Sequence, residues 1–291
     1  MRQMEKKWLC YGEDWRSLLF TGITLALLLF PVYAAINTWM IFPWIVISTL
    51  FCFSACIINH NHVHHPVFIN ETGNRIFSIL LSLARGHTSF GVIVAHNYNH
   101  HRHNGNEKDW ISTRLAGEGN GFVRLLRYII MATISMAKGR NKPDAPELPA
   151  GMEKQLRIQR FFLLAFIVLV GVSGTWKALF FVGLPWLLSV AMLVGVNLLQ
   201  HDYCDPESEL NHSRNFLSFT GNWFFFNNGY HAIHHLQPEL HWSRLPESHM
   251  SLVAGQAKPV LQCRSIIGFL LTYYVFSTDQ TQLKLSMAGS S

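Results

Sequence analysis

Two uncharged runs near the start of the chain constrain its fold more than any other feature. Residues 18–36 contain no charged side chain, and after the polar pair Asn37-Thr38 a second such run occupies residues 39–58. A helix of about 20 residues crosses a hydrocarbon layer roughly 30 Å thick, because each residue adds about 1.5 Å. The two runs therefore predict a pair of membrane-spanning helices joined by a short turn.

The same pattern returns in the second half of the chain. Residues 161–176 and 178–199 form two further uncharged stretches that are separated by Lys177 alone. The first of these spans is expected to extend backwards into Gln159-Arg160, which gives it bounds of about 159–176. Charged residues make up only 14% of the chain against 49% hydrophobic ones, which fits a protein surrounded by lipid. The sequence thus predicts an all-α integral membrane protein with four spans in two hairpins, organised as a single membrane domain over residues 1–291.

The distribution of basic residues predicts how these spans are oriented. Of the 23 basic residues, 4 precede the first span, none lies in the first turn, 1 lies in the second turn, and the other 18 fall in the remaining segments. Lys and Arg strongly prefer the cytoplasmic flanks of spans, so both termini and the middle segment are expected to be cytoplasmic. The net charge of +6 is therefore explained by basic residues on the cytoplasmic side of the membrane. Nucleic-acid binding is not indicated, because the sequence contains no basic nucleic-acid-binding fold.

Three other apolar segments contain charges and are not predicted to span. Residues 76–95 include Arg85 and His87, so we expect a helix in the interface or packed under the bundle. Residues 122–137 and 260–276 carry arginines among aliphatic residues. Both are expected to form amphipathic helices on the cytoplasmic membrane face, and with the middle segment they make up a cytoplasmic helical cap.

Histidines are the second informative feature. All 16 lie outside the four predicted spans, and one, His201, directly follows the fourth span. Most of the others belong to three groups, which are His60, His62, His64 and His65, then His96, His100, His101 and His103, and finally His231, His234 and His235. The predicted orientation puts every group on the same aqueous side.

The spacing within the groups matches one face of a helix. Positions i, i+3 and i+4 share a face, so His231, His234 and His235 can converge on one point. His96 and His100 have the i, i+4 spacing, as do Asn197 and His201.

Two positions leave alternatives open. His101 follows His96 by five residues and would point about 140° away on an ideal helix, which indicates a second metal or a distorted turn. In the first group, His60 can pair with either His64 or His65, and we favour His64.

The number of imidazoles predicts the type of site. Neutral imidazole binds iron, zinc, copper and nickel, but one zinc site needs only three or four protein ligands. The eight or nine candidates here therefore predict two metals. An isolated histidine is usually structural, and we interpret five of the more scattered histidines in this way, namely His87, His103, His212, His241 and His249. The role of His62 is left undecided.

At these residues the chain resembles the membrane fatty acid desaturase and hydroxylase superfamily, which has three histidine boxes around four spanning helices. The resemblance covers roughly residues 17–250, and the third box lies between Asn227-Asn228-Gly229-Tyr230 and Leu236-Gln237-Pro238. The boxes correspond to His60 and His64, to His96, His100 and His101, and to His231, His234 and His235.

This resemblance implies two iron ions, O2 as co-substrate, and desaturation of an unactivated alkyl chain, first of all a fatty-acyl group. It also implies that His201 is an additional ligand and that Asn197 holds a metal-bound water. No haem-binding electron-carrier domain is visible in the sequence. The electrons are therefore expected from a separate donor of the ferredoxin, rubredoxin or cytochrome b5 type.

Two other functions remain as alternatives. An alkyl or carotenoid hydroxylase or ketolase would use the same site, and a membrane metal-binding or transport protein would also need clustered histidines. No Asp, Glu, Lys, Arg or His lies in the four apolar runs 18–36, 39–58, 161–176 and 178–199, which argues against transport.

Some charged residues near the boxes have two possible interpretations. Asp109, Asp202 and Asp205 can orient imidazole N–H groups or be solvated loop charges. Four basic residues can contact a phosphate head group of the substrate, a redox partner or membrane lipid, namely Arg102, Lys108, Arg214 and Arg244.

Overall fold

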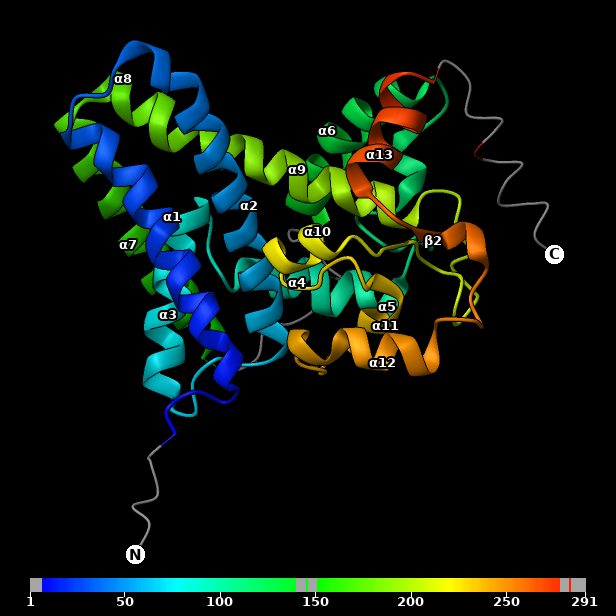
Figure 1. Cartoon of the computed structure of the whole chain (residues 1–291). Coiled ribbons are helices and arrows are strands. Elements are labelled where there is room, and N and C mark those ends of the chain that lie inside the picture. The colour runs from blue at the N-terminus through cyan, green and yellow to red at the C-terminus, as the bar shows by residue number, and fades with distance from the viewer. Residues whose placement is uncertain (1–6, 140–144, 146–150, 278–282, 284–291) are drawn as a thin grey trace, which may run out of the picture. The chain divides into compact units, whose positions relative to one another are not determined.

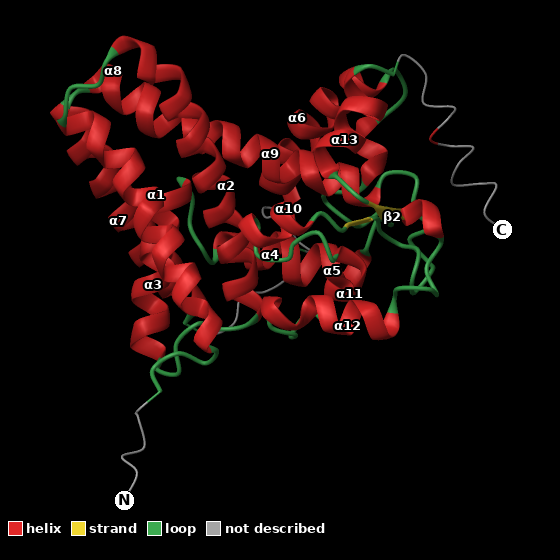
Figure 2. Cartoon of the chain, in the orientation of Figure 1, coloured by secondary structure: helices red, strands yellow, loops and turns green. Residues whose placement is uncertain are grey.

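A computed structural model describes residues 7–139, 145, 151–277 and 283, and helices dominate it (Figure 2). Four helices are long and apolar enough to cross a membrane, and they are Gly12–Tyr33, Thr38–His64, Met152–Ser173 and Thr175–His201. These helices contain the four predicted apolar stretches almost completely. The prediction of an all-α membrane protein with four spans is therefore confirmed.

The chain divides into two compact units. Unit 1 consists of Met1–Val92 and Leu148–Val190, and unit 2 consists of Ile93–Glu147 and Ala191–Ser291. Two helices contain a boundary between the units, namely α4 (Gly91–Ala95) and α9 (Leu184–His201).

Unit 1 is a bundle of long helices (Figure 1). The side chains of Thr24 and Trp44 donate hydrogen bonds between α1 and α2, to the carbonyl oxygens of Phe51 (3.2 Å) and Leu27 (2.9 Å). Its elements are α1 (Trp15–Tyr33), α2 (Ile41–His64), α3 (Glu71–Arg85), α7 (Met152–Ser173) and α8 (Thr175–Ala178). One cluster of its buried core consists of Leu28, Val32, Cys52, Phe166, Val170 and Val182.

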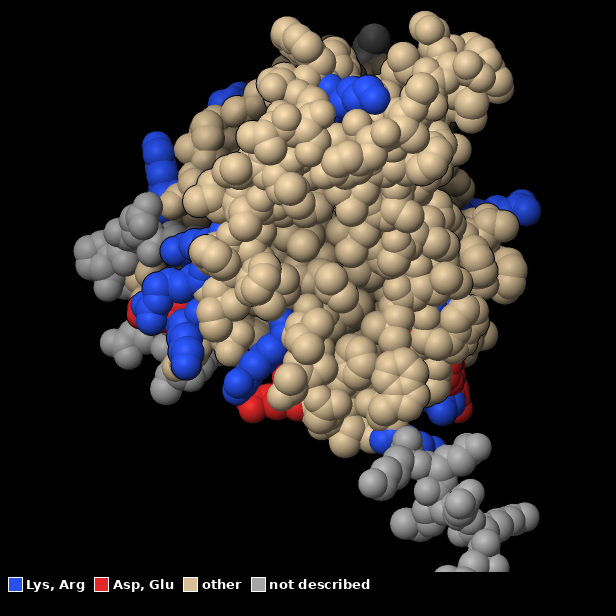
Figure 3. All heavy atoms as spheres, turned by 90° about the vertical axis from the view of Figure 1, so that its left-hand side faces the viewer, with Lys and Arg blue, Asp and Glu red and all other residues tan. Residues whose placement is uncertain are grey.

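The outer face of unit 1 is apolar. Phe42 and Val172 are 76% and 79% exposed, although both belong to spans. In Figure 3 the middle of the face turned to the viewer is free of charge, whereas basic side chains lie mainly along its left and lower edges and one lies near the top. Apolar side chains at such exposures match a lipid environment, where contact with acyl chains removes them from water.

Helix α3 covers the first half of the segment 76–95, and it is not among the four helices that are long and apolar enough to span. It contacts α1, α2 and α7 (Figure 1). Gly86 ends it in a left-handed conformation with φ of 78°, and a Cβ at this position would lie 2.4 Å from the Trp186 ring. Because Trp186 belongs to the span Thr175–His201, the end of α3 is packed against a membrane-spanning segment.

Unit 2 is built from shorter elements. Its helices are the π-helical turn η3 (His96–His100), α5 (His101–His103), α6 (Gly121–Gly139), α10 (Phe219–Phe224), α11 (His231–Leu236), α12 (Leu245–Leu252) and α13 (Ile266–Leu270). Two short parallel strands, β1 (Asn215–Phe216) and β2 (Gln262–Cys263), are an addition to the predicted all-helical architecture. The predicted helix over residues 122–137 corresponds to α6, whereas residues 260–276 divide into several shorter elements, among them β2 and α13.

Single turns complete the described structure. The 3-10 turns are η1 (Gly12–Asp14), η2 (Thr38–Met40), η4 (Thr113–Ala116), η6 (Trp242–Arg244) and η7 (Pro259–Leu261), and the further π-helical turns are η5 (Leu179–Gly183) and η8 (Leu271–Val275).

Candidate metal centre

The long helices continue past their apolar stretches into the histidine groups. Helix α2 runs on through His60 and ends at His64, and α9 ends at His201. These histidines therefore belong to the ends of spanning helices, which corrects the expectation that all of them lie outside the spans. A rigid helix end limits the positions that such side chains can reach.

Four imidazoles of unit 2 converge on one point. His100, His201, His231 and His235 each offer one nitrogen, and these four atoms all lie within 4.8 Å of one another. We call them the first imidazole group. They come from η3, α9 and α11, which are separated by many residues in the sequence.

The distances in the first imidazole group match a shared metal. The Nε2 atom of His231 lies 2.8 Å from Nε2 of His201 and 3.1 Å from Nε2 of His235. Two imidazole nitrogens that bind one metal at about 2.1 Å are separated by roughly 3.0 to 3.4 Å for angles of about 90° to 110°.

A π-helical turn positions His101. The backbone N–H of His101 donates to the carbonyl of His96, five residues earlier, instead of forming the four-residue bond of an α-helix. The wider turn brings the two Nε2 atoms to 2.9 Å. His101 therefore does not point 140° away from His96, and the structure contains the distorted turn that was one of the two predicted alternatives.

His101 also contacts the third histidine box. Its Nε2 atom lies 3.2 Å from Nε2 of His234, and its ring stacks on His235 with a centroid distance of 4.5 Å. We call His96, His101 and His234 the second imidazole group. The stacked rings of His101 and His235 join it to the first group.

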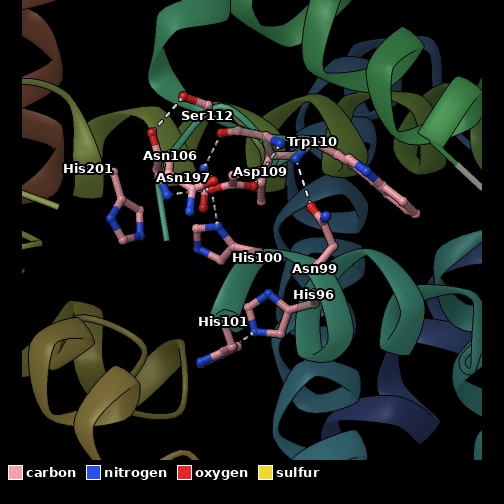
Figure 4. A network of polar contacts seen from close by, with 12 residues as sticks. His96, Asn99, His100, His101, Asn106, Asp109, Trp110, Ser112, Asn197 and His201 are labelled. Atoms are coloured by element: carbon pink, nitrogen blue, oxygen red, sulfur yellow. Dashed lines mark hydrogen bonds and ion pairs between the residues drawn. The ribbon is translucent and has the colours of Figure 1, made fainter. Parts of the chain in front are cut away.

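Asp109 orients one of these ligands. Its Oδ2 accepts a hydrogen bond of 2.8 Å from Nδ1 of His100, and both side chains are buried (Figure 4). Burial alone would raise the pKa of Asp109, but His100 and the backbone N–H groups of Ile111 and Gly105 outweigh it and leave this pKa lowered. The carboxylate therefore stays ionised and holds the proton of His100 on Nδ1.

The remaining nitrogen of His100 is available to a metal. Its Nε2 is buried and has no hydrogen-bond partner within the described part of the chain. A carboxylate behind a metal-binding histidine fixes the ring and strengthens its basicity. For Asp109, the structure thus favours the orienting role over that of a solvated charge.

Backbone and amide groups hold the end of α9. Nδ1 of His201 lies 3.1 Å from the carbonyl oxygen of His212, so this nitrogen is the donor and Nε2 faces the first imidazole group. The Asn197 amide donates to Tyr128 Oη at 2.6 Å and lies near His201 in Figure 4. Tyr128 in turn donates to the carbonyl of Ile111 at 2.5 Å.

In unit 1 the histidines of the first box have different roles. The rings of His60 and His64 are 5.2 Å apart on one face of α2, as their spacing predicts. His65 is the C-cap and bonds to the carbonyl of Pro66. His62 is buried, where it hydrogen-bonds to Ser78 at 3.1 Å. The geometry therefore pairs His60 with His64 and gives His62 a structural role.

Other charged candidates do not reach the imidazoles. Asp202 accepts two hydrogen bonds from Arg124, at 2.7 and 2.8 Å, and Asp205 accepts from the backbone N–H of Glu207. Arg214 is fully buried and donates to the carbonyl oxygens of Leu199 and Asp202. Arg214 therefore cannot meet a head group or a redox partner at the surface, which corrects that expectation.

Two residues near the site were not identified from the sequence. His212, interpreted as structural, has its ring 5.1 Å from that of His235, and its Nδ1 bonds to the carbonyl oxygens of Ser208 and Glu209. Tyr128 lies within the apolar helix α6, where nothing in the local pattern distinguishes it. Only the contacts of these residues reveal their positions, because neither has the spacing of a box.

The donor set suits a transition metal. Burial first, and then the neighbouring histidines, lower the pKa of His235 far below its usual value, so this ring is neutral at pH 7. Neutral imidazoles without a carboxylate ligand favour iron, zinc, copper or nickel over magnesium or calcium. The residues of this site therefore fit the metal that the sequence implies.

The comparisons with known proteins agree with this chemistry. No curated protein matches the chain at a significant level. The family model described as fatty acid desaturase matches residues 37–265, which include all three histidine boxes and His201. Since this match covers most of the sequence and the matched residues carry the converging imidazoles, the chain belongs to the fatty acid desaturase family.

Proposed function

We propose that this protein desaturates an unactivated alkyl chain, first of all a fatty-acyl group, in an O2-dependent reaction at a di-iron centre. Membership of the fatty acid desaturase family makes it an oxidoreductase of the desaturase and hydroxylase type. The observation that carries the finer proposal is the convergence of His100, His201, His231 and His235 within 4.8 Å. Two bound irons would supply the activation of O2 that C–H cleavage requires.

We assign the ligands in two sets. The first imidazole group holds one iron, while His96, His101 and His234 contribute to the second. The three-box pattern of the family supports His60 and His64 as further ligands of this second iron. Asn197, next to His201 on α9, is proposed to hold a metal-bound water.

The residues behind the ligands keep the site in its binding geometry. Asp109 holds the ring of His100, and the carbonyl of His212 holds His201 in the tautomer that presents Nε2. Ligands fixed in this way do not have to reorganise when a metal binds. The apolar spans would deliver the alkyl chain, and a ligand frame of this rigidity would define the carbon that reacts.

The proposal includes an orientation and a partner. The excess of basic residues outside the two turns supports cytoplasmic termini and a cytoplasmic metal centre. A separate protein of the ferredoxin, rubredoxin or cytochrome b5 type would supply electrons at that side.

Mass spectrometry of cellular lipids tests this function. Cells that express the chain should contain a new unsaturated acyl group, and His235→Ala should lower its amount at least about 100-fold, because a ligand is lost. The matched control is His103→Ala, which removes a histidine of the neighbouring helix α5 that belongs to neither imidazole group. A new hydroxyl in place of a double bond would redirect the proposal to hydroxylation.

Metal analysis provides an independent check. The purified protein should bind about two irons per chain, as the ligand count requires, and fewer in the His235→Ala variant. Full activity with zinc alone would contradict the di-iron assignment.

A further inference from the structure

Unit 1 contains a buried cationic group that the metal chemistry does not use. The side chain of Arg85, the last residue of α3, is fully buried. Its Nη2 donates to Nδ1 of His87, but Nε and Nη1 have no hydrogen-bond partner among the residues that the structure describes. No carboxylate of the described residues forms an ion pair with it.

His87 adds another donor at the same place. Since its Nδ1 accepts from Arg85, its ring proton is on Nε2, which is buried and lacks a partner in the described structure. Burial first, and then the charge of Arg85, keep the pKa of His87 well below its usual value, so the ring is neutral. Burial lowers the pKa of Arg85 to about 10, which leaves the guanidinium charged at neutral pH.

The pair therefore presents N–H donors and one positive charge. Buried donors are almost always hydrogen-bonded, and buried charges are almost always paired. A water molecule would satisfy some donors but would not balance the charge. A ligand with one negative charge and several acceptor positions satisfies both requirements.

The surroundings of the pair identify the rest of the ligand. Gly86, between Arg85 and His87, lies against the ring of Trp186, and this ring contacts the ring of Phe166 in α7 in a tilted arrangement, with centroids 5.8 Å apart. Trp186 and Leu83 pack on the apolar core of unit 1. An anion that reaches Arg85 is therefore surrounded by membrane-spanning apolar helices, which favours an amphiphile over a small inorganic ion.

We propose that Arg85 and His87 form a binding site for the carboxylate of an unesterified long-chain fatty acid, whose alkyl chain packs among the helices of unit 1. The guanidinium and the Nε2–H of His87 donate to the two carboxylate oxygens. This site goes beyond the di-iron proposal, because it uses no metal ligand and does not depend on O2 chemistry.

A binding experiment on the full chain in detergent tests the ligand class. Palmitate should raise the Tm of the protein in proportion to its occupancy, whereas methyl palmitate and acetate should not, because each lacks one of the two required features. Equal stabilisation by palmitate and its methyl ester would overturn the proposal, and so would stabilisation by acetate alone.

Substitutions then test the residues. Arg85→Gln should weaken palmitate binding at least about tenfold, because a charge-assisted hydrogen bond is lost. The matched control is Arg75→Gln on the same helix, where the arginine is half exposed and pairs with Glu71 at 2.8 Å; its palmitate affinity should stay within about twofold. Unchanged affinity in the Arg85→Gln variant would refute the site.

The stability of the ligand-free protein separates this site from a merely structural arginine. Replacing an unpaired buried charge by an apolar side chain usually stabilises a fold, so Arg85→Met should keep or raise the Tm without palmitate and lose the palmitate response. A large fall in Tm together with a retained response would contradict the proposal. Neither result depends on product formation, so failure here leaves the desaturase proposal untouched.

Discussion

The two compact units treat buried charge differently. In unit 2 the guanidinium of Arg124 meets the carboxylate of Asp202 at 2.7 Å, and His100 meets Asp109 at 2.8 Å. In unit 1 the buried Arg85 has no carboxylate partner among the described residues. Unit 2 provides carboxylates for Arg124 and His100 and carbonyl oxygens for the buried Arg214, whereas unit 1 leaves the charge of Arg85 for a ligand.

The difference reflects what each unit must do. Metal ligands need fixed tautomers and ring positions, so unit 2 surrounds them with hydrogen bonds that hold each ring. Unit 1 is a bundle of apolar helices whose stability comes from side-chain packing and from the lipid around it. A buried charge is costly in such a bundle unless an opposite charge pairs with it, and a bound anion would provide that pairing.

The largest expected effect comes from breaking the internal balance of unit 2. Asp202→Ala removes the partner of Arg124 and the acceptor of the Tyr274 hydroxyl. An uncompensated buried charge should lower the free energy of unfolding by about 3–5 kcal/mol, measured by chemical unfolding in detergent. Glu107→Gln, which breaks the exposed pair with Arg114, is the control and should cost less than about 1 kcal/mol. Equal effects would remove the distinction between buried and exposed pairs.

A smaller effect is expected when the ring of His100 loses the carboxylate that orients it. Asp109→Asn keeps the shape of the side chain but removes the charge that holds the proton of His100 on Nδ1. Metal affinity should fall about 10- to 100-fold, with the fold retained. Competition with a chromophoric chelator measures the affinity. A wild-type affinity would show that the position of His100 does not depend on this carboxylate.

Acid should destabilise the metal-free protein in both units. Burial is the main cause that lowers the pKa values of His212, His235 and His249 in unit 2, and also that of His87 in unit 1. These rings are neutral in the folded protein but take up protons near pH 6.5 once unfolded. The metal-free protein should therefore lose stability as the pH falls below about 6.5, by up to about 1.4 kcal/mol per pH unit for each ring.

Hydrogen exchange at a series of pH values locates this loss. Amide protection should decrease first near the affected rings, in α11 and α12 of unit 2 and at the C-terminal end of α3 in unit 1, and later in α1. Loss of protection in α1 before these segments would show that the buried histidines do not control the acid stability.

The smallest effect should come from an exposed pair in unit 1. Arg75→Ala breaks the contact with Glu71 on α3, where both side chains are at least half exposed. The free energy of unfolding should change by only about 0.3–0.5 kcal/mol, because solvent screens the pair. Chemical unfolding under the same conditions as for Asp202→Ala gives the comparison, and a loss of several kcal/mol would contradict it.

Much of the metal centre was predictable from local spacing. The i, i+3 and i+4 pattern of His231, His234 and His235 places these rings on one helical turn, and α11 contains that turn. Spacing could not predict the position of His101, because an ideal α-helix and a π-helical turn give different directions for the fifth residue. The hydrogen bond from His101 to the carbonyl of His96 decides between them.

The charged residues show the limit of local patterns even more clearly. Arg85, Arg124 and Arg214 look alike in the sequence, as basic residues near apolar segments. In the fold, Arg124 pairs with a carboxylate, Arg214 binds carbonyl oxygens, and Arg85 pairs with no carboxylate of the described residues. These differences depend on groups far away in the chain, which local periodicity does not encode.

The sequence by itself determined the four spans and the grouping of the histidines, because span length, absence of charge and helical spacing are local properties. Only the tertiary structure decided which imidazoles of unit 2 meet, which carboxylate orients His100, and which buried arginine has no carboxylate partner among the described residues. Those outcomes depend on contacts between segments that are distant in the chain, and such contacts form only when the helices pack.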